Sequence, residues 1–389
     1  MKAMVAGLGM QGKAVTHDLS KSGLIDQVIA LDVDLSSARV FLENGGYTNV
    51  TSIEADAMDQ AVLLDLIAQH QIDVLICMMP AWLCGPIAIT CIEAGIPYIC
   101  TTYAAVLEGL DELARQKGVL LLPEMGFDPG IDLLLAAKAV AQLDEVHGLN
   151  SYGSGVPEPK ACDNPINYKI SWTFDGVLAA YARPARLLKQ GKKVEIPASD
   201  IFNDEWVEIM DIPDVGLMES YPNGDAVKFI PAMDLGPELK EMGRFTTRWP
   251  GHCEFWRTMS HLGFLSEKPI DMGDGVSVLP RSFLSRLLTP HLQYRDDERD
   301  LAFLRVHAWG LKDKQPKSII YDLIDYRDLK TGFYAMNRTV GYTASIAAQM
   351  VLKRQIRGTG ILSPMKNVDV DLVLEELGKR GVSIIQRDS

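Results

Sequence analysis

The chain has 389 residues, of which 47% are hydrophobic and 23% charged, a composition typical of globular proteins and a length that allows two domains. Its formal net charge of −13 argues against nucleic acid or an anionic membrane as partner, because polyanions are bound through concentrated lysine and arginine. The six cysteines include no CxxC pair, which favours reduced thiols in a cytoplasmic protein. Met1 leads directly into a predicted strand, so we expect no signal peptide.

Up to about Pro123, short apolar runs alternate with helical patterns. The predicted strands are Lys2–Ala6, Gln27–Leu31, Thr51–Glu54, Val74–Met78, Tyr98–Thr101 and Val119–Leu122. The predicted helices are Gln11–Ser22, Leu35–Asn44, Met58–Gln69, Pro86–Ala94 and Gly109–Lys117. Strand–helix–strand units at this spacing predict right-handed crossovers and a doubly wound parallel sheet, which is an α/β Rossmann domain.

One uncharged stretch, Val74–Ile92, is long enough to suggest a membrane span. Pro80 and the Gly85-Pro86 pair interrupt it. The favoured interpretation is therefore a buried parallel strand, a loop and a helix.

After Pro123 the pattern changes to turns rich in glycine, proline and asparagine. Further helices are predicted at Pro129–Leu143, Tyr342–Gln355 and Val368–Gly381, and strands at Asn167–Trp172, Leu304–Trp309 and Ser318–Asp325. Alternating polar and apolar residues in these strands predict an α+β domain with a mostly antiparallel sheet.

The loop after the first strand, Gly7-Leu8-Gly9-Met10-Gln11-Gly12, matches the GxGxxG fingerprint of dinucleotide binding. The first glycine permits a tight turn, the second admits a pyrophosphate, and the third lets helix and strand pack closely. The helix start offers free N–H groups to the phosphates. We therefore predict that Gly7, Gly9, Met10, Gln11 and Gly12 bind a dinucleotide, the alternative being a glycine-rich turn without a ligand.

Asp32 ends the second predicted strand, twenty residues after Gly12. A carboxylate there can accept hydrogen bonds from both ribose hydroxyls and repels a 2′-phosphate, which favours NAD while NADP stays possible. The adjacent Val33 belongs to the same predicted site. Asp34 is an alternative ribose contact, and Arg39, which could favour NADP, falls inside the following helix.

Later strand ends should complete the coenzyme site, because ligands bind at the carboxyl edge of doubly wound sheets. Asp56 and Ala57 follow the third strand, where the adenine should lie. Met79 and Pro80 follow the fourth, near the expected nicotinamide, although the methionine could equally fill the core. Thr101 ends the fifth strand and belongs to the same set.

Four longer motifs follow one another along the chain. They are Cys100-Thr101-Thr102-Tyr103, Gly126-Phe127-Asp128-Pro129-Gly130-Ile131-Asp132, Tyr152-Gly153-Ser154-Gly155-Val156-Pro157 and Asp163-Asn164-Pro165-Ile166-Asn167-Tyr168-Lys169-Ile170-Ser171-Trp172. In this order they resemble the saccharopine dehydrogenase family, specifically the glutamate-forming saccharopine reductases. Ala182–Arg186 and Arg248–His252 resemble the related lysine 6-dehydrogenases, and the resemblance continues to Gly358–Pro364.

The resemblance implies three segments: a dinucleotide-binding domain at 1–123, a substrate-binding and dimerisation domain at 124–340, and a C-terminal segment, 341–389, that returns to the Rossmann domain. It also implies a homodimer and an NAD(P)-dependent reaction at the C–N bond on the ε-carbon of a lysine skeleton. In saccharopine reductases the residues matching Tyr103 and Asp128 lie at the substrate.

The chemistry of the residues agrees with this resemblance. Hydride removal from a carbon that bears nitrogen needs a neutral amine, and lysine's ε-amine has a pKa near ~10.4. Asp128 could accept that proton at the sheet edge, with Pro129 starting the helix behind it. Tyr103 could donate to a carboxylate or orient water. The alternatives are an N-cap aspartate and a packed tyrosine.

A lysine-type substrate carries at least one carboxylate, for which arginine is the natural partner. Arg248 is the first candidate, with Arg244 and Lys169 behind it, and each could instead be a surface charge. His252 could act as a base near neutral pH or be structural, and Thr102 completes the predicted substrate set. Without clustered histidine and cysteine ligands we expect no metal.

The sequence departs from both relatives. Asp128 and Asp163-Asn164-Pro165 favour a saccharopine reductase, since lysine 6-dehydrogenases tend to have alanine in place of Asp128. Conversely, Gly224 stands where saccharopine reductases usually have arginine, Gly153 replaces a frequent cysteine, a long helical insert is missing, and Asp32 favours NAD. We favour saccharopine, with NAD-dependent lysine 6-dehydrogenase as the alternative. A non-catalytic NADH-binding regulator and a dehydrogenase of C–O bonds are further alternatives.

Overall fold

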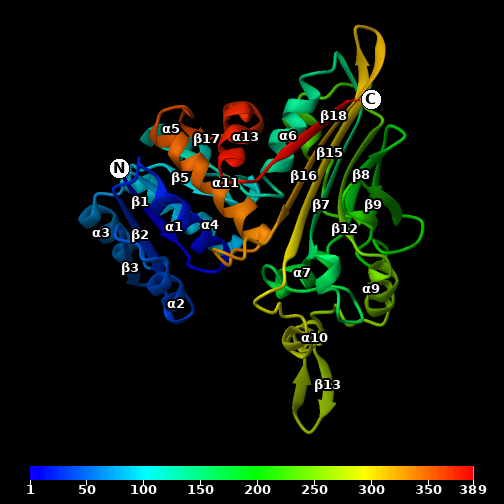
Figure 1. Ribbon diagram of the computed structural model, residues 1–389, viewed down its shortest axis with the longest axis horizontal. Coiled ribbons are helices and arrows are strands. Elements are labelled where there is room, and N and C mark those ends of the chain that lie inside the picture. The colour runs from blue at the N-terminus through cyan, green and yellow to red at the C-terminus, as the bar shows by residue number, and fades with distance from the viewer. Residues whose placement is uncertain (389) are drawn as a thin grey trace. The chain divides into compact units, whose positions relative to one another are not determined.

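The computed structural model describes residues 1–388 and divides into two compact units. The first comprises Met1–Leu135 and Asn337–Ser383, so its blue-to-cyan part and its orange-to-red part come from opposite ends of the chain (Figure 1). The second comprises Ala136–Met336 and the segment from Ile384 onward.

The first unit is built on a seven-stranded sheet with the order β17-β6-β5-β4-β1-β2-β3. Every pairing in it is parallel. The strands are β1 (Lys2–Ala6), β2 (Gln27–Asp32), β3 (Val50–Glu54), β4 (Val74–Cys77), β5 (Tyr98–Cys100), β6 (Leu120–Leu122) and β17 (Gly360–Ile361). This order confirms the Rossmann fold, and it reverses between β1 and β4, where dinucleotides bind in such sheets.

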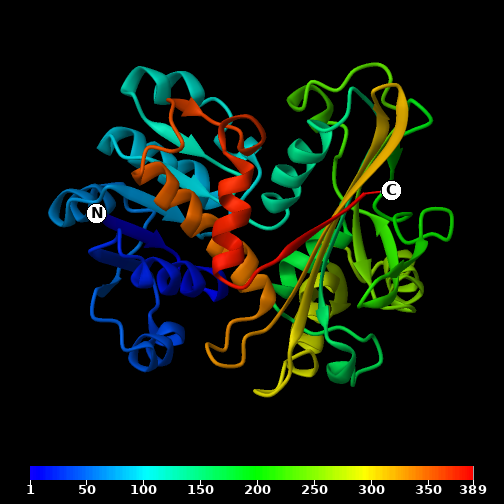
Figure 2. The same cartoon turned by 45° about the horizontal axis from the view of Figure 1, so that its top comes forward.

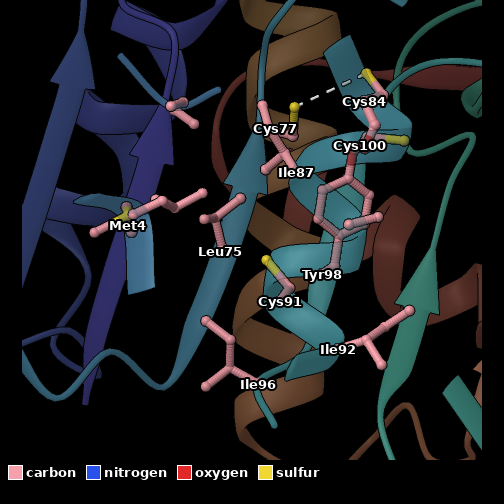
Figure 3. Packing of buried hydrophobic residues seen from close by; sticks show 14 of the residues in the cluster. Met4, Leu75, Cys77, Cys84, Ile87, Cys91, Ile92, Ile96, Tyr98 and Cys100 are labelled. Atoms are coloured by element: carbon pink, nitrogen blue, oxygen red, sulfur yellow. Dashed lines mark hydrogen bonds between the residues drawn. The ribbon is translucent and has the colours of Figure 1, made fainter. Parts of the chain in front are cut away.

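Helices connect these strands and bury their apolar faces against the sheet. They are α1 (Met10–Lys21), α2 (Ser36–Gly45), α3 (Gln60–His70), α4 (Ala81–Ala94) and α5 (Asp111–Lys117), with a 3-10 turn η1 (Ala104–Leu107) before α5. Figure 3 shows the core between α4 and the sheet, where Leu75, Ile87 and Tyr98 are fully buried. Burial of such side chains provides most of the driving force for this packing.

Helix α4 begins at Ala81, five residues before the predicted start at Pro86. Pro80 is its N-cap, and Pro86 lies inside the helix without ending it. Proline removes one helical N–H, but the buried face of α4 keeps the helix in place. Among the described residues no helix is long and apolar enough to cross a membrane.

The C-terminal part of the first unit packs on α1. Helix α11 (Ala335–Leu352) places Gly341 so close to α1 that a Cβ there would lie 2.7 Å from that of Ala14. The other elements are α12 (Pro364–Asn367) and α13 (Val370–Lys379). Figure 2 shows α13 in red beside α11 in orange. Asp18 of α1 joins them, because it accepts from Ser345 at 2.6 Å and pairs with Arg380 at 2.7 Å.

Helix α11 was predicted only from Tyr342 because its N-terminal cap comes from a distant strand. The carboxylate of Asp300 accepts the N–H groups of Ala335 at 2.7 Å and Met336 at 3.2 Å. A cap satisfies N–H groups that the first helical turn leaves without partners. No local pattern marks this start.

The second unit contains a nine-stranded sheet whose main path is β10-β11-β12-β7-β15-β16-β18, with β8 pairing β12 and β9 pairing β8. Only β12–β7 is parallel among the pairings described in this sheet, which confirms the predicted mostly antiparallel domain. The strands are β7 (Glu145–Pro157), β8 (Ala185–Lys189), β9 (Lys192–Ile196), β10 (Glu208–Ile212), β11 (Gly216–Pro222), β12 (Glu241–Arg248), β15 (Asp300–Lys312), β16 (Gln315–Tyr326) and β18 (Ile384–Asp388). In Figure 2 the red β18 runs beside β16.

A separate hairpin belongs to the second unit, together with several short helices. They are α6 (Ile131–Val140), which crosses between the units, α7 (Phe174–Tyr181), α8 (Phe229–Ala232), α9 (His252–His261), α10 (Pro280–Leu288), η2 (Pro159–Ala161) and η3 (Thr289–His291). The hairpin consists of β13 (Ile270–Gly273) and β14 (Val276–Val278). Helix α6 starts after Pro129, which therefore precedes the helix rather than opening it.

The predicted strand Asn167–Trp172 is wrong, because this segment is an irregular loop. Asn164 holds it: its Oδ1 accepts the N–H groups of Ile166 and Tyr168, and its Nδ2 donates to the Tyr168 carbonyl at 2.8 Å. Asparagine side chains compete in this way with the hydrogen bonds of a strand. The apolar residues of the loop are buried as loop residues.

Candidate functional site: a coenzyme edge and a buried arginine

The GxGxxG segment forms a tight turn between β1 and α1. Gly7 has φ +98°, and a Cβ there would lie 2.9 Å from both the Met78 carbonyl and the Met79 sulfur. A Cβ on Gly12 would lie 1.8 Å from the Gly7 carbonyl, whereas one on Gly9 would meet nothing within 4 Å. Gly7 and Gly12 are therefore required for packing, and Gly9 leaves open space for a ligand.

Helix α1 begins at this open space. Gly9 is its N-cap, no side chain caps the helix, and its first turn, which contains Met10 and Gln11, has no acidic residue. Unshielded N–H groups and the positive end of the helix dipole favour an anion. This cradle fits a pyrophosphate.

Asp32 lies at the end of β2, beside the turn. Its Oδ2 accepts the Leu8 N–H at 2.6 Å, and its Oδ1 accepts the Asp34 N–H at 3.2 Å. Asp34 instead accepts hydrogen bonds from the backbone and hydroxyl of Ser36, the first residue of α2, at 2.8 Å each. The geometry thus favours Asp32 over Asp34 as the ribose contact.

Two other side chains flank Asp32. Lys13 donates to the Ser37 carbonyl at 2.6 Å, and burial lowers its pKa while the charge of Asp32 acts in the opposite direction. Val33 is exposed, and Arg39 is exposed on α2. An exposed apolar side chain next to the ribose position suits one face of an adenine.

The next strand ends lie at the same carboxyl edge of the sheet. Asp56 is exposed and accepts the Met58 N–H at 2.8 Å, and Ala57 is buried behind it. After β4, Met79 is half-buried and Pro80 exposed. Parallel strands place these predicted coenzyme residues, with Thr101 after β5, along one edge.

Tyr103 and Asp128 lie on neighbouring loops after β5 and β6, and both are half-buried. Glu124 joins these loops: its N–H donates to the Thr102 carbonyl at 3.0 Å, and its Oε1 accepts the Ala104 N–H at 3.2 Å. Glu124 is 6% exposed and has φ +62°. This buried glutamate, in a backbone conformation uncommon for residues other than glycine, links two loops that carry predicted catalytic residues, and the sequence analysis did not single it out.

Asp132 supports the Asp128 loop from the other side. Its Oδ1 accepts the Gly130 N–H at 2.7 Å, and its side chain is buried. Burial raises the pKa of Asp132 to about 7, and the charge of Glu124 adds to that rise. The carboxyl groups of Asp132 and Glu124 therefore lie close enough to influence each other's charge.

Arg248, at the end of β12 in the second unit, lies in an aromatic box. It is 6% exposed; its Nη1 donates to the Thr247 carbonyl at 2.9 Å and its Nε to the Tyr181 hydroxyl at 3.4 Å. Its guanidinium lies 5.3 Å from the centre of the Tyr168 ring. None of the described ion pairs gives Arg248 a carboxylate.

The remaining predicted substrate residues differ in their surroundings. Arg244 is buried four residues before Arg248 on β12, so both side chains lie on one face of the strand. His252 contacts the Tyr181 hydroxyl at 2.8 Å, and burial, with Arg248 second, lowers its pKa well below its usual value. A strongly lowered pKa makes His252 a weak proton acceptor, which argues against a role as general base near neutral pH.

Lys169 and Thr102 are engaged elsewhere. Lys169 is buried and contacts both Glu298 oxygens, at 2.7 and 2.8 Å, and Asp163 at 2.8 Å. Two carboxylates already neutralise this ammonium, which favours a structural role over substrate binding. The Thr102 hydroxyl is directed to the sulfurs of Cys84 and Cys100. Within the described residues no cluster of potential metal ligands is found.

Comparison with known proteins places both parts of the chain in one family. The model of the saccharopine dehydrogenase NADP binding domain matches residues 3–122, and that of the saccharopine dehydrogenase C-terminal domain matches residues 126–382. Apo saccharopine dehydrogenase (L-Glu forming) from Saccharomyces cerevisiae has the same fold, with a TM-score of 0.86 at 24% identity, covering 100% of this chain and 99% of that one.

Curated relatives are similar along most of this chain. The saccharopine dehydrogenase [NADP(+), L-glutamate-forming] of Schizosaccharomyces pombe is 26% identical, covering 90% of this chain and 91% of that protein. The alpha-aminoadipic semialdehyde synthase of Arabidopsis thaliana is 24% identical over 92% of this chain, which spans only 40% of that longer protein. The Rossmann unit is thus a nicotinamide-coenzyme domain, and the chain belongs to the saccharopine dehydrogenase family of oxidoreductases.

Proposed function

We propose that this enzyme transfers a hydride between a nicotinamide coenzyme and the C–N bond on the ε-carbon of a lysine-type amino acid, with saccharopine as the substrate and glutamate as a product. The observation that carries this proposal is Arg248, a buried guanidinium whose described contacts are tyrosines and a carbonyl. A buried charge without a counter-ion is costly, so a substrate carboxylate would be the partner that this guanidinium lacks.

The placement of Arg244 supports a substrate with more than one carboxylate. Residues four apart on a strand are separated by about 13 Å, and their side chains lie on the same face. Two guanidinium groups in one row suit a long molecule that carries an acidic group near each end. Saccharopine has three carboxylates and lysine one, which is why we place saccharopine first.

Asp128 and Tyr103 would supply the proton chemistry. The bound coenzyme would accept the hydride. The Asp128 carboxylate would accept the proton from the substrate ammonium, which leaves the nitrogen lone pair free to stabilise the developing iminium. Tyr103 would orient the amine or the water that attacks the iminium, and Glu124 would keep the two loops in register.

We propose NAD rather than NADP as the preferred coenzyme. The Asp32 carboxylate next to the phosphate turn can accept hydrogen bonds from the ribose hydroxyls and would repel a 2′-phosphate. The Schizosaccharomyces pombe relative and the matching domain are named for NADP, so this preference would separate the present chain from them. Asp32 is the residue on which the difference depends.

The alternative substrate is lysine, oxidised at its ε-amine. Gly224 favours it, because the glycine stands where saccharopine reductases usually have arginine, and the missing guanidinium would weaken binding of a glutamate-type carboxylate. Initial rates of coenzyme reduction at alkaline pH, with saccharopine and lysine in parallel and NAD and NADP in parallel, decide between them. Turnover with hydroxy acids alone would overturn both candidates.

A further inference from the structure

Three thiols from separate elements meet below the carboxyl edge of the Rossmann sheet. Cys77 ends β4 and Cys100 ends β5, and the two are register partners, so their side chains lie on the same face of the sheet. Cys84, in the first turns of α4, lies over them (Figure 3). All three are buried free cysteines.

Their sulfur atoms are in direct contact. The Cys77 thiol donates to the Cys84 sulfur at 3.8 Å, and the Thr102 hydroxyl donates to the sulfurs of Cys84 and Cys100 at 3.3 Å each. A disulfide needs its sulfurs about 2.05 Å apart. Rotation of two side chains that already face each other can supply much of the remaining shift.

The hydrogen bonds distinguish the three thiols. Donation from Cys100, then from Cys77, lowers the pKa of Cys84, with a further contribution from Thr102. Hydrogen bonding to Cys84 together with burial raises the pKa values of Cys77 and Cys100. Cys84 therefore has the lowest pKa of the three thiols, and the thiolate is the form that reacts with oxidants and disulfides.

We propose that Cys84 and Cys77 form a site of reversible thiol oxidation that controls coenzyme binding. A peroxide oxidises the Cys84 thiolate to a sulfenic acid, and hydroxide leaves. The Cys77 sulfur then attacks the Cys84 sulfur, its thiol proton and the sulfenic hydroxyl leave as water, and a disulfide remains. In total, two thiols are oxidised by two electrons and one peroxide is reduced to two waters.

The segment between these cysteines explains the expected effect. Met78, Met79 and Pro80 connect β4 to α4, and Gly7 packs directly against the first two. Drawing the two sulfurs together by about 1.8 Å strains this connection. The strain should reach the phosphate turn through Gly7, so the disulfide should weaken dinucleotide binding. This argument rests on the proposed coenzyme edge and not on the identity of the substrate.

Burial restricts which reagents can reach the pair. Cys77 and Cys84 are each 1% exposed, so a small peroxide is the appropriate oxidant and bulky alkylating reagents are not. Cys91 provides a matched control, because it lies on the same helix, is fully buried, and has its pKa raised by burial alone.

The test compares the full-length chain with Cys77→Ala, Cys84→Ala and Cys91→Ala before and after hydrogen peroxide. Chymotrypsin cleaves after aromatic residues such as Tyr47, Trp82 and Tyr98, and so places Cys77 in fragment 48–82 and Cys84 with Cys91 in fragment 83–98. NADH affinity is measured by fluorescence titration in each state, and thermal melting confirms that every variant is folded.

In the parent chain and in Cys91→Ala, peroxide should link the two fragments with loss of two hydrogens and weaken NADH binding about tenfold, and dithiothreitol should reverse both changes. Cys77→Ala and Cys84→Ala should show neither change. Absence of the link in the parent, persistence of the link in Cys84→Ala, or a link that leaves NADH affinity unchanged would each overturn the proposal. If the reduced parent chain does not bind NADH, the proposed coenzyme site itself is wrong.

Discussion

The two candidate binding regions of this enzyme are built in opposite ways. The coenzyme edge consists mainly of backbone: two glycines packed against neighbouring chain, one glycine beside open space, and an uncapped helix start. The surroundings of Arg248 consist of side chains from β11, β12, α7, α9 and an intervening loop. A backbone site is encoded by a short local pattern, whereas a side-chain pocket depends on residues far apart in the sequence.

The largest effect is expected for substitution of Asp128, which should change the rate of the reaction and not the affinity for the coenzyme. Asp128→Asn should lower kcat/KM by about 10²–10⁴-fold, since it removes a positioned proton acceptor. NADH affinity should stay within about twofold of the parent, because the substitution lies outside the phosphate turn. Steady-state kinetics and a binding titration check both; an unchanged kcat/KM would exclude Asp128 as the base.

Substitution of Arg248 should weaken substrate binding without destabilising the fold. Arg248→Met should raise KM for the amino acid by about a hundredfold, equivalent to ~2.7 kcal/mol, while removing a buried charge that has no described carboxylate partner. Its free energy of unfolding should be unchanged or higher. Denaturant titration provides that measurement.

Arg305→Met is the matched control for this prediction. Arg305 is paired with buried Asp322 through two bonds, at 2.7 and 2.8 Å. Removing it leaves buried Asp322 with only the Arg387 contact, at 3.1 Å, and should cost about 1–3 kcal/mol of stability. Equal destabilisation by both substitutions would mean that Arg248 is a structural residue.

The backbone site predicts a smaller effect from its one specific side chain. Asp32→Asn keeps an acceptor for the Leu8 N–H but removes the charge that repels a 2′-phosphate. The ratio of kcat/KM for NAD to that for NADP should fall about tenfold or more. A parent enzyme that already prefers NADP would contradict the role given to Asp32.

The smallest effect is expected at the residue that joins the two loops. Glu124→Ala should lower kcat about tenfold, since the Ala104 N–H loses its acceptor and Tyr103 and Asp128 lose their fixed spacing. Glu124→Gln keeps an acceptor oxygen and should recover most of kcat. Similar losses in both variants would point to the charge of Glu124 and not to its position.

The sequence predicted the Rossmann unit well because its evidence is local. Strand β7 was missed because Gly148, Gly153 and Gly155 interrupt its alternation. Two of these glycines are required by packing: a Cβ on Gly148 would lie 1.9 Å from the Trp309 ring, and one on Gly155 would lie 2.9 Å from Met336. The side chains that require these glycines, those of Trp309 and Met336, lie more than a hundred residues further along the chain.

The same limit applies to the site. The phosphate turn and Asp32 could be identified from spacing alone. Lys169 could not be assigned, because only the fold brings Glu298 against it from 129 residues away. Glu124 gave a weak signal at most, as an acidic residue between an apolar strand and the Asp128 loop. Contacts between distant residues decide whether a charged side chain is available to a substrate.

Isotope transfer from the substrate carbon tests the proposed reaction most directly. Saccharopine in which both hydrogens of the ε-carbon are replaced by deuterium is incubated with the enzyme and oxidised NAD. The reduced coenzyme is then analysed by mass spectrometry. Hydride transfer from that C–N carbon predicts one deuterium in each molecule of reduced coenzyme. Reduced coenzyme without deuterium, or none formed from saccharopine or from lysine labelled at the same carbon, would contradict the account.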